Sequence, residues 1–319
     1  MRHMLTRWLL AGILAGSALL TTVAPSRAAH AASAPTIAFV NINFEAIYFQ
    51  QLNAGARQMA NKLHAHLVIY NANNNPQAQN SAIEAYVAQH VAAIIVDAID
   101  VHGILPAVKV AAAHHIPVVA VDAETSGPGV KTWVGVGNGQ GGSTLGRYVD
   151  RYVRQHMHGR ANVGIVGALN SFIQIERQNG FERALKRVPG IKVVQVVDGK
   201  NQQEVALTAA EDLLTGNPTM NVIYATGEPA LIGTVAAVKA RHATGKIKVF
   251  GWDLSPQSVT GIRQGWVIAV VQQNPYGEGQ QAVAQAMKLI HGQMVPAQAL
   301  LPLDIVTKAN VDKFVSKIY

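Results

Sequence analysis

Short apolar runs alternate with amphipathic stretches along most of the chain. The first run, residues 36–40, lies between Pro35 and Asn41 and predicts a strand. In the stretch that follows, Leu52, Ala56, Met59 and Leu63 recur at the spacing of one helical face. Because this alternation repeats about every thirty residues, it predicts β-α units and a doubly wound parallel sheet.

The later runs keep the same pattern and are rich in Val and Ile at every position, which is typical of strands covered by helices on both faces. The predicted strands cover residues 36–40, 66–70, 92–96, 117–121, 131–136, 162–166, 192–197, 221–225, 246–250, 266–271 and 300–306. The predicted helices cover residues 47–63, 76–90, 101–115, 172–186, 204–214, 229–241 and 276–291, with a further helix starting after Asp253.

A glycine-rich run at residues 135–142 divides this pattern into two similar α/β lobes. It lacks the Gly-Lys-Ser/Thr ending of a phosphate-binding loop, and we interpret it as a close crossing between the lobes. No low-complexity linker separates the two halves. We therefore expect the chain to cross between them more than once.

The amino-terminal segment has the features of a secretory signal. Arg2 and Arg7 precede an apolar stretch over residues 8–23, and residues 25–35 are rich in Ala and Ser, with suitable cleavage sites. We predict a cleavable signal peptide at residues 1–34 and a periplasmic mature protein. The alternative is an uncleaved anchor, although the apolar core is short for a membrane span.

Composition excludes several kinds of chemistry. The 319 residues include no Cys, so disulfides, metal-thiolate sites and thiol nucleophiles are absent. The net charge of +8 is scattered, and part of it lies in the signal segment. Because the chain carries no basic helix and is predicted to be exported, we expect no nucleic-acid partner.

Polar side chains follow several predicted strands, where ligands bind in open α/β sheets. Carboxylates there can accept hydrogen bonds from neighbouring hydroxyls, an Arg can donate to their oxygens, and aromatic rings can cover the apolar face of a sugar. This pattern therefore indicates a cleft for a hydroxyl-rich ligand. The candidate ligand-binding residues are Asn43, Glu45, Tyr48, Phe49, Asp97, Asp122, Arg177, Glu228, Asp253 and Gln273.

Each of these residues also has a structural interpretation. A single Asp after a strand is most often a helix N-cap, and Tyr48 and Phe49 suit a core equally well. Asp100 and Ser255 are better placed as caps than Asp97 and Asp253. The two neighbours would leave both aspartates free for a ligand.

Several segments together resemble the periplasmic sugar-binding proteins of ABC importers, of the ribose-binding type related to repressor effector domains. They include "TIAFVNINFEAIYFQQLNAGARQMANKL", "IERQNGFERAL", "VFGWDLSP" and "VIAVVQQNPYGEGQQAVAQAMKLIHG". The resemblance covers about residues 35–306. It implies two Rossmann-like lobes joined by a three-segment hinge. The lobes would be residues 35–137 with 274–303, and residues 138–273 with 304–319.

The resemblance assigns sugar contacts to Tyr48, Phe49, Asp97, Asp122, Arg177, Asp253 and Gln273. Other positions depart from ribose binders. Ala46 and Gly227 replace an Asn, Ala123 replaces an Arg, and residues 200–202 replace a second-lobe aromatic. These departures argue against ribose itself. They leave another pentose, a hexose, a polyol or an autoinducer-type diol as the expected ligand.

Rival functions have weaker support. A glycosidase-like or other small-molecule enzyme on the same scaffold is the main alternative, with Asp97 and Asp122 as its carboxylate pair. The twelve histidines include no pair at zinc-binding helical spacing beside an acid, so we expect no metal. A repressor would carry a DNA-binding helix-turn-helix in place of the signal segment.

We therefore predict a periplasmic substrate-binding protein that is not an enzyme and needs no cofactor. It is expected to be a monomer that closes over its ligand and docks on the membrane permease of an ABC importer. The sequence leaves open whether it also presents the ligand to a chemoreceptor.

Overall fold

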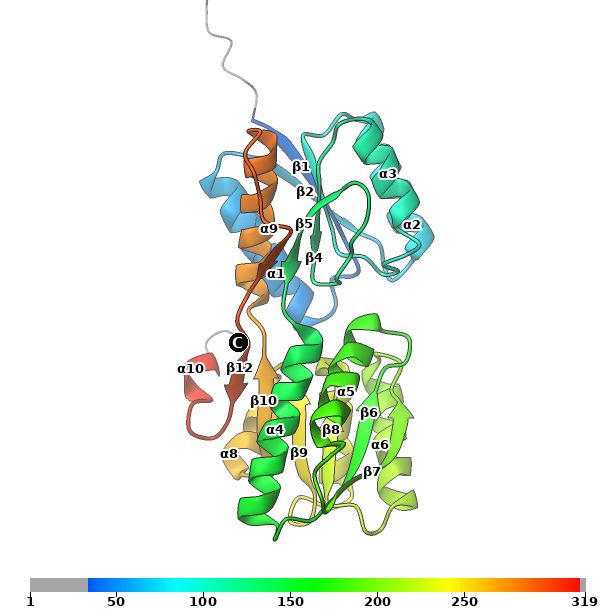
Figure 1. Ribbon diagram of the computed structural model, residues 1–319, viewed down its shortest axis with the longest axis vertical. Coiled ribbons are helices and arrows are strands. Elements are labelled where there is room, and N and C mark those ends of the chain that lie inside the picture. Colours follow the sequence, from blue (N-terminus) through cyan, green and yellow to red (C-terminus); the bar gives the residue numbers. More distant parts are fainter. Residues whose placement is uncertain (1–33, 316–319) are drawn as a thin grey trace, which may run out of the picture. The chain divides into compact units, whose positions relative to one another are not determined.

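Two six-stranded sheets organise residues 34–315, which are the residues that the computed structural model describes. The predicted signal peptide falls outside this part of the chain, apart from Ala34. Each sheet, with the helices on its two faces, is called a lobe below. The expectation of two doubly wound α/β lobes is confirmed (Figure 1).

The first lobe contains a fully parallel sheet in the order β11-β5-β4-β3-β1-β2. Alternate residues of β1 point to opposite faces, so that Phe39 packs with α1 and α9 while Val40 packs with α2 and α3. Helix α9, far along the chain, thereby packs beside α1 (Figure 1). The elements of this lobe are β1 (Thr36–Asn41), α1 (Ile47–Lys62), β2 (His66–Asn71), α2 (Pro76–Ala88), β3 (Ala93–Val96), α3 (Leu105–Ala113), β4 (Val118–Val121), β5 (Val130–Gly135), α9 (Pro275–Ile290) and β11 (Gln298–Leu300).

The second lobe contains a sheet in the order β12-β10-β9-β8-β6-β7, parallel except for β12, which runs antiparallel to β10. Helices α4 and α5 cover one face, and α6, α7 and α8 cover the other. The elements of this lobe are α4 (Asn138–His156), β6 (Ala161–Gly167), α5 (Phe172–Leu185), β7 (Ile191–Asp198), α6 (Gln203–Gly216), β8 (Val222–Ala225), α7 (Glu228–Ala240), β9 (Lys248–Trp252), α8 (Pro256–Gln264), β10 (Val267–Gln272), β12 (Asp304–Val306) and α10 (Asp312–Val315).

The chain passes between the sheets three times: between β5 and α4, between β10 and α9, and between β11 and β12. The prediction of one last strand over residues 300–306 is therefore wrong. This segment ends the first sheet at Leu300 and joins the second at Asp304. Pro302, which has no N–H to donate to a ladder, lies in the crossing between them.

The glycine-rich run is mostly helical, which corrects its interpretation as a crossing. Helix α4 begins at Asn138, so the crossing is confined to residues 136–137. A Cβ atom on Gly142 would overlap the carbonyl oxygen of Arg177, and one on Gly180 would overlap that of Gly139. These glycines allow α4 and α5 to pack closely. Glycine disfavours helices in isolation, which explains why α4 was not predicted over its full length.

The structure shows how the two predicted capping residues, Ser255 and Asp100, are bonded. Ser255 accepts a hydrogen bond from the amide of Ser258 in a capping box, so its predicted role as the cap of α8 is confirmed. Asp100 accepts from the amides of His102 and Gly103, at 2.9 Å each. It therefore caps a turn that precedes α3, and the helix starts at Leu105 rather than at the predicted residue 101.

Candidate functional site

A cavity of about 710 Å³ is lined by residues from both lobes. Most of these residues follow the carboxyl ends of strands or begin the next helix, as ligand-binding residues do in open α/β sheets. The lining includes Asn43, Glu45, Tyr48, Phe49, Asp122, Arg177, Glu228, Asp253 and Gln273. All of the sequence-predicted site residues except Asp97 therefore meet at this cavity.

Asp122 and Asp253 occupy matching positions in the two lobes. Asp122 follows β4 and Asp253 follows β9, and the amide of each still donates to the neighbouring strand, to Val134 and Val271 respectively. Their φ angles are +59° and +60°, in the left-handed region that costs energy for residues other than Gly. Asp tolerates this region better than most residues. Each lobe thus presents one carboxyl group to the cavity on the same kind of backbone turn.

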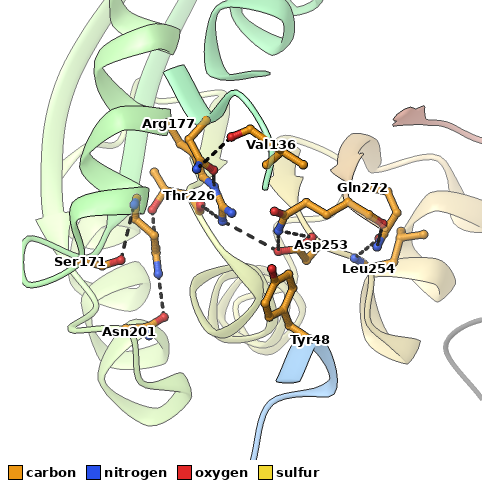
Figure 2. A network of polar contacts seen from close by, with 12 residues as sticks. Tyr48, Val136, Ser171, Arg177, Asn201, Thr226, Asp253, Leu254 and Gln272 are labelled. Carbon is orange, nitrogen blue, oxygen red and sulfur yellow. Dashed lines mark hydrogen bonds and ion pairs between the residues drawn. The ribbon is translucent and has the colours of Figure 1, made fainter. Parts of the chain in front are cut away.

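Arg177 holds the second-lobe side of the site in place. It is buried, with its Nε donating to Asn138 at 2.8 Å and its Nη1 donating to the carbonyl of Thr226 at 3.3 Å. Its Nη1 also lies 3.8 Å from Oδ2 of Asp253 (Figure 2). The guanidinium carbon stands 4.1 Å from the centroid of the Trp252 ring, a cation–π contact. Trp252 is fully buried and supports Arg177 rather than lining the cavity.

Asp253 has a second fixed partner in Gln273, whose Nε2 donates to both carboxyl oxygens at 3.1 and 2.9 Å. Burial raises the pKa of Asp253, and Arg177 and Gln273 oppose that rise. Arg177, Asp253 and Gln273 are therefore positioned by protein contacts before any ligand binds. Such preorganisation lowers the cost of binding.

Tyr48 and Phe49 are both core residues and lining residues. They are 8% and 9% exposed, belong to the core beneath α1, and form an edge-to-face pair with centroids 5.4 Å apart. The hydroxyl of Tyr48 donates to Oε2 of Glu278 at 2.7 Å. The aromatic pair therefore belongs to the core and also reaches the cavity lining, and its contact with a ligand stays a prediction.

Glu278 is a buried acid of the site region that the strand-end pattern missed. It lies on α9 with no exposed surface, and burial, followed by the nearby Asp122, raises its pKa to about 8. A sequence signal was available, because Glu278 falls in helical register with the buried Ala282 and Ala286. An acid on the apolar face of a helix is unusual enough to mark a site.

Asp97 lies outside the cavity lining and is completely buried. Within residues 34–315, neither of its carboxyl oxygens has a hydrogen-bond partner of good geometry. Burial raises its pKa well above the usual range, as do Asp122 and Glu278, while the backbone amide of Ala123 opposes this rise. Burial likewise raises the pKa of Asp122 to about 6. Asp97, Asp122 and Glu278 therefore form one coupled group of acids, called the first-lobe acid cluster below.

Glu228 joins the two lobes. It is the first residue of α7 in the second lobe, and its carboxyl group lies close enough to the backbone amides of Ile47 and Tyr48 in the first lobe for them to lower its pKa. Burial and the nearby Asp253 raise its pKa to about 7, against the lowering effect of those amides. The amides belong to the first turn of α1, where a helix favours negative charge.

The remaining lining mixes apolar residues with polar side chains and includes the exposed aromatic ring of Phe172. Gln174 donates to Asn201 at 2.6 Å and accepts from Thr226 at 2.7 Å, which orders the loop that departs from the ribose-binding pattern (Figure 2). Asn43 donates to Asn74 at 3.0 Å and accepts from the amide of Glu45. Phe172, 46% exposed at the start of α5, supplies a second-lobe aromatic that was not predicted.

Residues 34–315 contain neither a metal-binding group of side chains nor a membrane-spanning helix. No group of three or more His, Asp or Glu residues within 34–315 is arranged to hold a metal ion. In the same part of the chain, no helix is both long and apolar enough to span a bilayer.

The fold and the cavity define a two-lobe ligand-binding protein. The family model of the periplasmic binding protein domain matches residues 37–294. The chain therefore belongs to this family, and the resemblance inferred from its sequence is confirmed.

The individual proteins that match this chain have low sequence identity to it. The chain is 25% identical over 301 residues to the ribose import binding protein RbsB of Salmonella typhimurium, covering 94% of this chain and 98% of the relative. It is 26% identical over 249 residues to the xylitol-binding protein of Mycolicibacterium smegmatis, covering 77% and 70%. An ABC transporter periplasmic solute binding protein from Actinobacillus succinogenes, solved with bound D-allose, superposes with a TM-score of 0.80 at 26% identity, covering 88% of this chain and 99% of that one.

Proposed function

We propose that this protein is the substrate-binding component of an ABC importer and captures a monosaccharide or polyol in the cavity between its lobes. The observation that carries this proposal is the matched pair Asp122 and Asp253, one at a strand end of each lobe, both lining one cavity. The ribose, xylitol and allose named for its relatives support a polyhydroxylated ligand.

Each kind of lining residue has a role in this proposal. Asp122 and Asp253 accept hydrogen bonds from ligand hydroxyls, and Arg177 donates to hydroxyl or ring oxygens. Glu228 and Gln273 extend these polar contacts, and Asn43 and Glu45 contribute from the turn before α1. Tyr48, Phe49 and Phe172 cover the apolar C–H faces of the ligand. Asp97 acts indirectly, as a buried acid behind the lining that interacts with Asp122.

Binding would be coupled to closure of the hinge formed by the three crossings. A ligand that contacts both lobes at once has differential affinity for the closed state and shifts the population toward it. The contact of Glu228 with the first turn of α1 supports this step, because it already joins the lobes beside the cavity. The closed form would then dock on a membrane permease, and presentation to a chemoreceptor is a second use of the same form.

The family assignment agrees with a periplasmic location, which we propose follows removal of the signal peptide at residues 1–34. We also propose that the protein binds its ligand without altering it. A glycosidase-like pair would require Asp97 and Asp122 to face the substrate together. Asp97 lies beneath the lining, which disfavours that alternative.

Thermal-shift screening with monosaccharides and polyols tests the proposal. A ligand at about 100 times its Kd should stabilise the protein by about 2.7 kcal/mol. Asp253→Asn should abolish that stabilisation with little change in the ligand-free Tm. The matched control is Asp212→Asn, at an exposed position of α6 outside the cavity. An Asp253→Asn variant that keeps the full ligand response would contradict the assignment, and recovery of a chemically altered ligand would contradict the absence of catalysis.

A further inference from the structure

The buried part of the cavity has more acidic than basic side chains. Asp122, Glu228 and Asp253 line it and are 6%, 9% and 7% exposed, whereas Arg177 is the buried cation among the described lining residues. Asp97 and Glu278 add two more carboxyl groups behind this lining and interact with Asp122. The exposed rim adds two acids and one base, so it does not reduce the excess of acidic side chains. These rim residues are Glu45, Glu204 and Lys200.

Arg177 cannot neutralise all of these groups. Its Nη1 is shared between Asp253 and the carbonyl of Thr226, and its Nε is used by Asn138. The backbone amides of α1 satisfy part of Glu228. In the first-lobe acid cluster, the attraction of Arg177 reaches both Asp122 and Glu278, yet the pKa of each stays raised.

Several acceptor atoms at this place have no hydrogen-bond partner within residues 34–315. They include Oδ1 of Asp122 and Oε1 of Gln273, which belong to lining residues, and Oε1 of Glu278 and both carboxyl oxygens of Asp97 behind them. Buried polar atoms are normally paired, so unpaired acceptors beside a cavity indicate donors that arrive with the ligand.

A neutral sugar supplies donors but no charge. Its hydroxyl groups can satisfy the free acceptors, but they bring no positive charge that would lower the raised pKa values of these buried acids, so Asp97 and Glu278 would keep their protons at pH 7. An ammonium group supplies up to three N–H donors together with a positive charge. An ammonium group therefore supplies both the hydrogen-bond donors and the positive charge that the first-lobe acid cluster lacks. No group of side chains in the described residues is arranged to hold a metal ion that could supply this charge.

We propose that the ligand is a polyhydroxylated molecule that also carries an amine, such as an amino sugar or an amino polyol, with its ammonium group facing Asp122 in front of Asp97 and Glu278. This inference rests on the proposed function and narrows its substrate class. Asp253, Gln273 and Arg177 then take the hydroxyl groups at the other side of the cavity, and Phe172 covers an apolar face.

Matched probe pairs test this inference. Calorimetric titration at about pH 7 compares D-glucosamine with D-glucose, D-galactosamine with D-galactose, and 1-amino-1-deoxysorbitol with sorbitol. N-acetyl-D-glucosamine serves as the probe whose nitrogen carries no charge. In at least one pair the amine should bind about tenfold more tightly than its neutral partner, because charge-assisted hydrogen bonds exceed neutral ones by about 1.4 kcal/mol. Raising NaCl should weaken the amine's binding more than the neutral probe's.

Two variants test whether the preference for amines depends on the first-lobe acid cluster. Asp122→Asn and Glu278→Gln should each reduce the ratio of amine to neutral affinity, whereas Glu84→Gln, at an exposed position of α2, should leave it unchanged. Glu278→Gln is informative because Glu278 does not line the cavity, so a reduced ratio means that the bound ammonium group lowers the pKa of Glu278 and lets it ionise, which Gln cannot do.

The outcomes separate this inference from the proposed function. If neutral sugars or polyols bind as tightly as their amines, the inference is overturned while the proposed function stands. If no probe of either series binds, both are overturned. If the amines are preferred but the two variants keep the full preference, the assignment to the first-lobe acid cluster is wrong.

Discussion

Replacing Glu278 with Gln should make the protein's stability less sensitive to pH. Glu278 has no exposed surface, and its pKa rises from 4.5 in the unfolded chain to about 8 in the folded protein. Between these values the unfolded chain releases a proton that the native state retains. Stability therefore falls as pH rises from about 4.5 to about 8.

The size of the effect follows from the shift. Each pKa unit corresponds to about 1.4 kcal/mol, so an isolated group would contribute on the order of 5 kcal/mol over this range. Glu278 shares its environment with Asp97, Asp122 and Tyr48, and Asp253 and Arg177 also act on it. Part of the shift belongs to these neighbours, and we expect a few kcal/mol for Glu278 itself. Gln retains an acceptor for the Tyr48 hydroxyl.

Urea unfolding at about pH 5 and about pH 8 measures this difference directly. Wild-type protein should lose more free energy of unfolding between the two pH values than Glu278→Gln, and the control Glu84→Gln should follow the wild type. Parallel losses in all three proteins would refute the reasoning. They would mean that Glu278 is ionised in the native state without cost.

Three further predictions test other parts of the structure. Phe172→Ala should weaken binding of the best probe about two- to tenfold in calorimetry, because it removes an aromatic face from the cavity; unchanged affinity would exclude that contact. Gly142→Ala should lower the free energy of urea unfolding by about 1–3 kcal/mol, since its Cβ overlaps the Arg177 carbonyl, and a neutral effect would show that α4 and α5 can separate freely. Ser255→Ala should cost about 1 kcal/mol in the same assay by removing the capping box, with Thr260→Ala, at an exposed position of α8, as the comparison.

The fold was predictable because its strands are buried on both faces and its helices on one. Those two periodicities differ enough to be recognised in a single sequence. The predicted boundaries of helices and strands were wrong where a requirement other than hydrophobic periodicity determined the sequence. Glycines that serve helix packing concealed the start of α4, and one apolar segment over residues 300–306 proved to serve two sheets.

The site was predictable where it follows strand ends. Asp122, Glu228 and Asp253 meet at the cavity as that rule requires. The rule predicts at which edge of the sheet a side chain lies, but not whether that side chain reaches the cavity. It therefore did not distinguish Asp97, which is buried behind the lining, from Asp122, which is part of it. It also contains nothing about helix interiors, which is why Glu278 was missed.

The third crossing limits how the lobes can move. Its residues 301–303 are fixed at both ends by strand pairing, β11 to β5 on one side and β12 to β10 on the other. Even fully extended, the chain from residue 300 to residue 304 spans only about 14 Å. This segment acts as a short tether, so the lobes can swing about it but cannot slide far apart. Opening of the cavity is therefore a rotation of the lobes about this segment rather than a translation of one lobe away from the other.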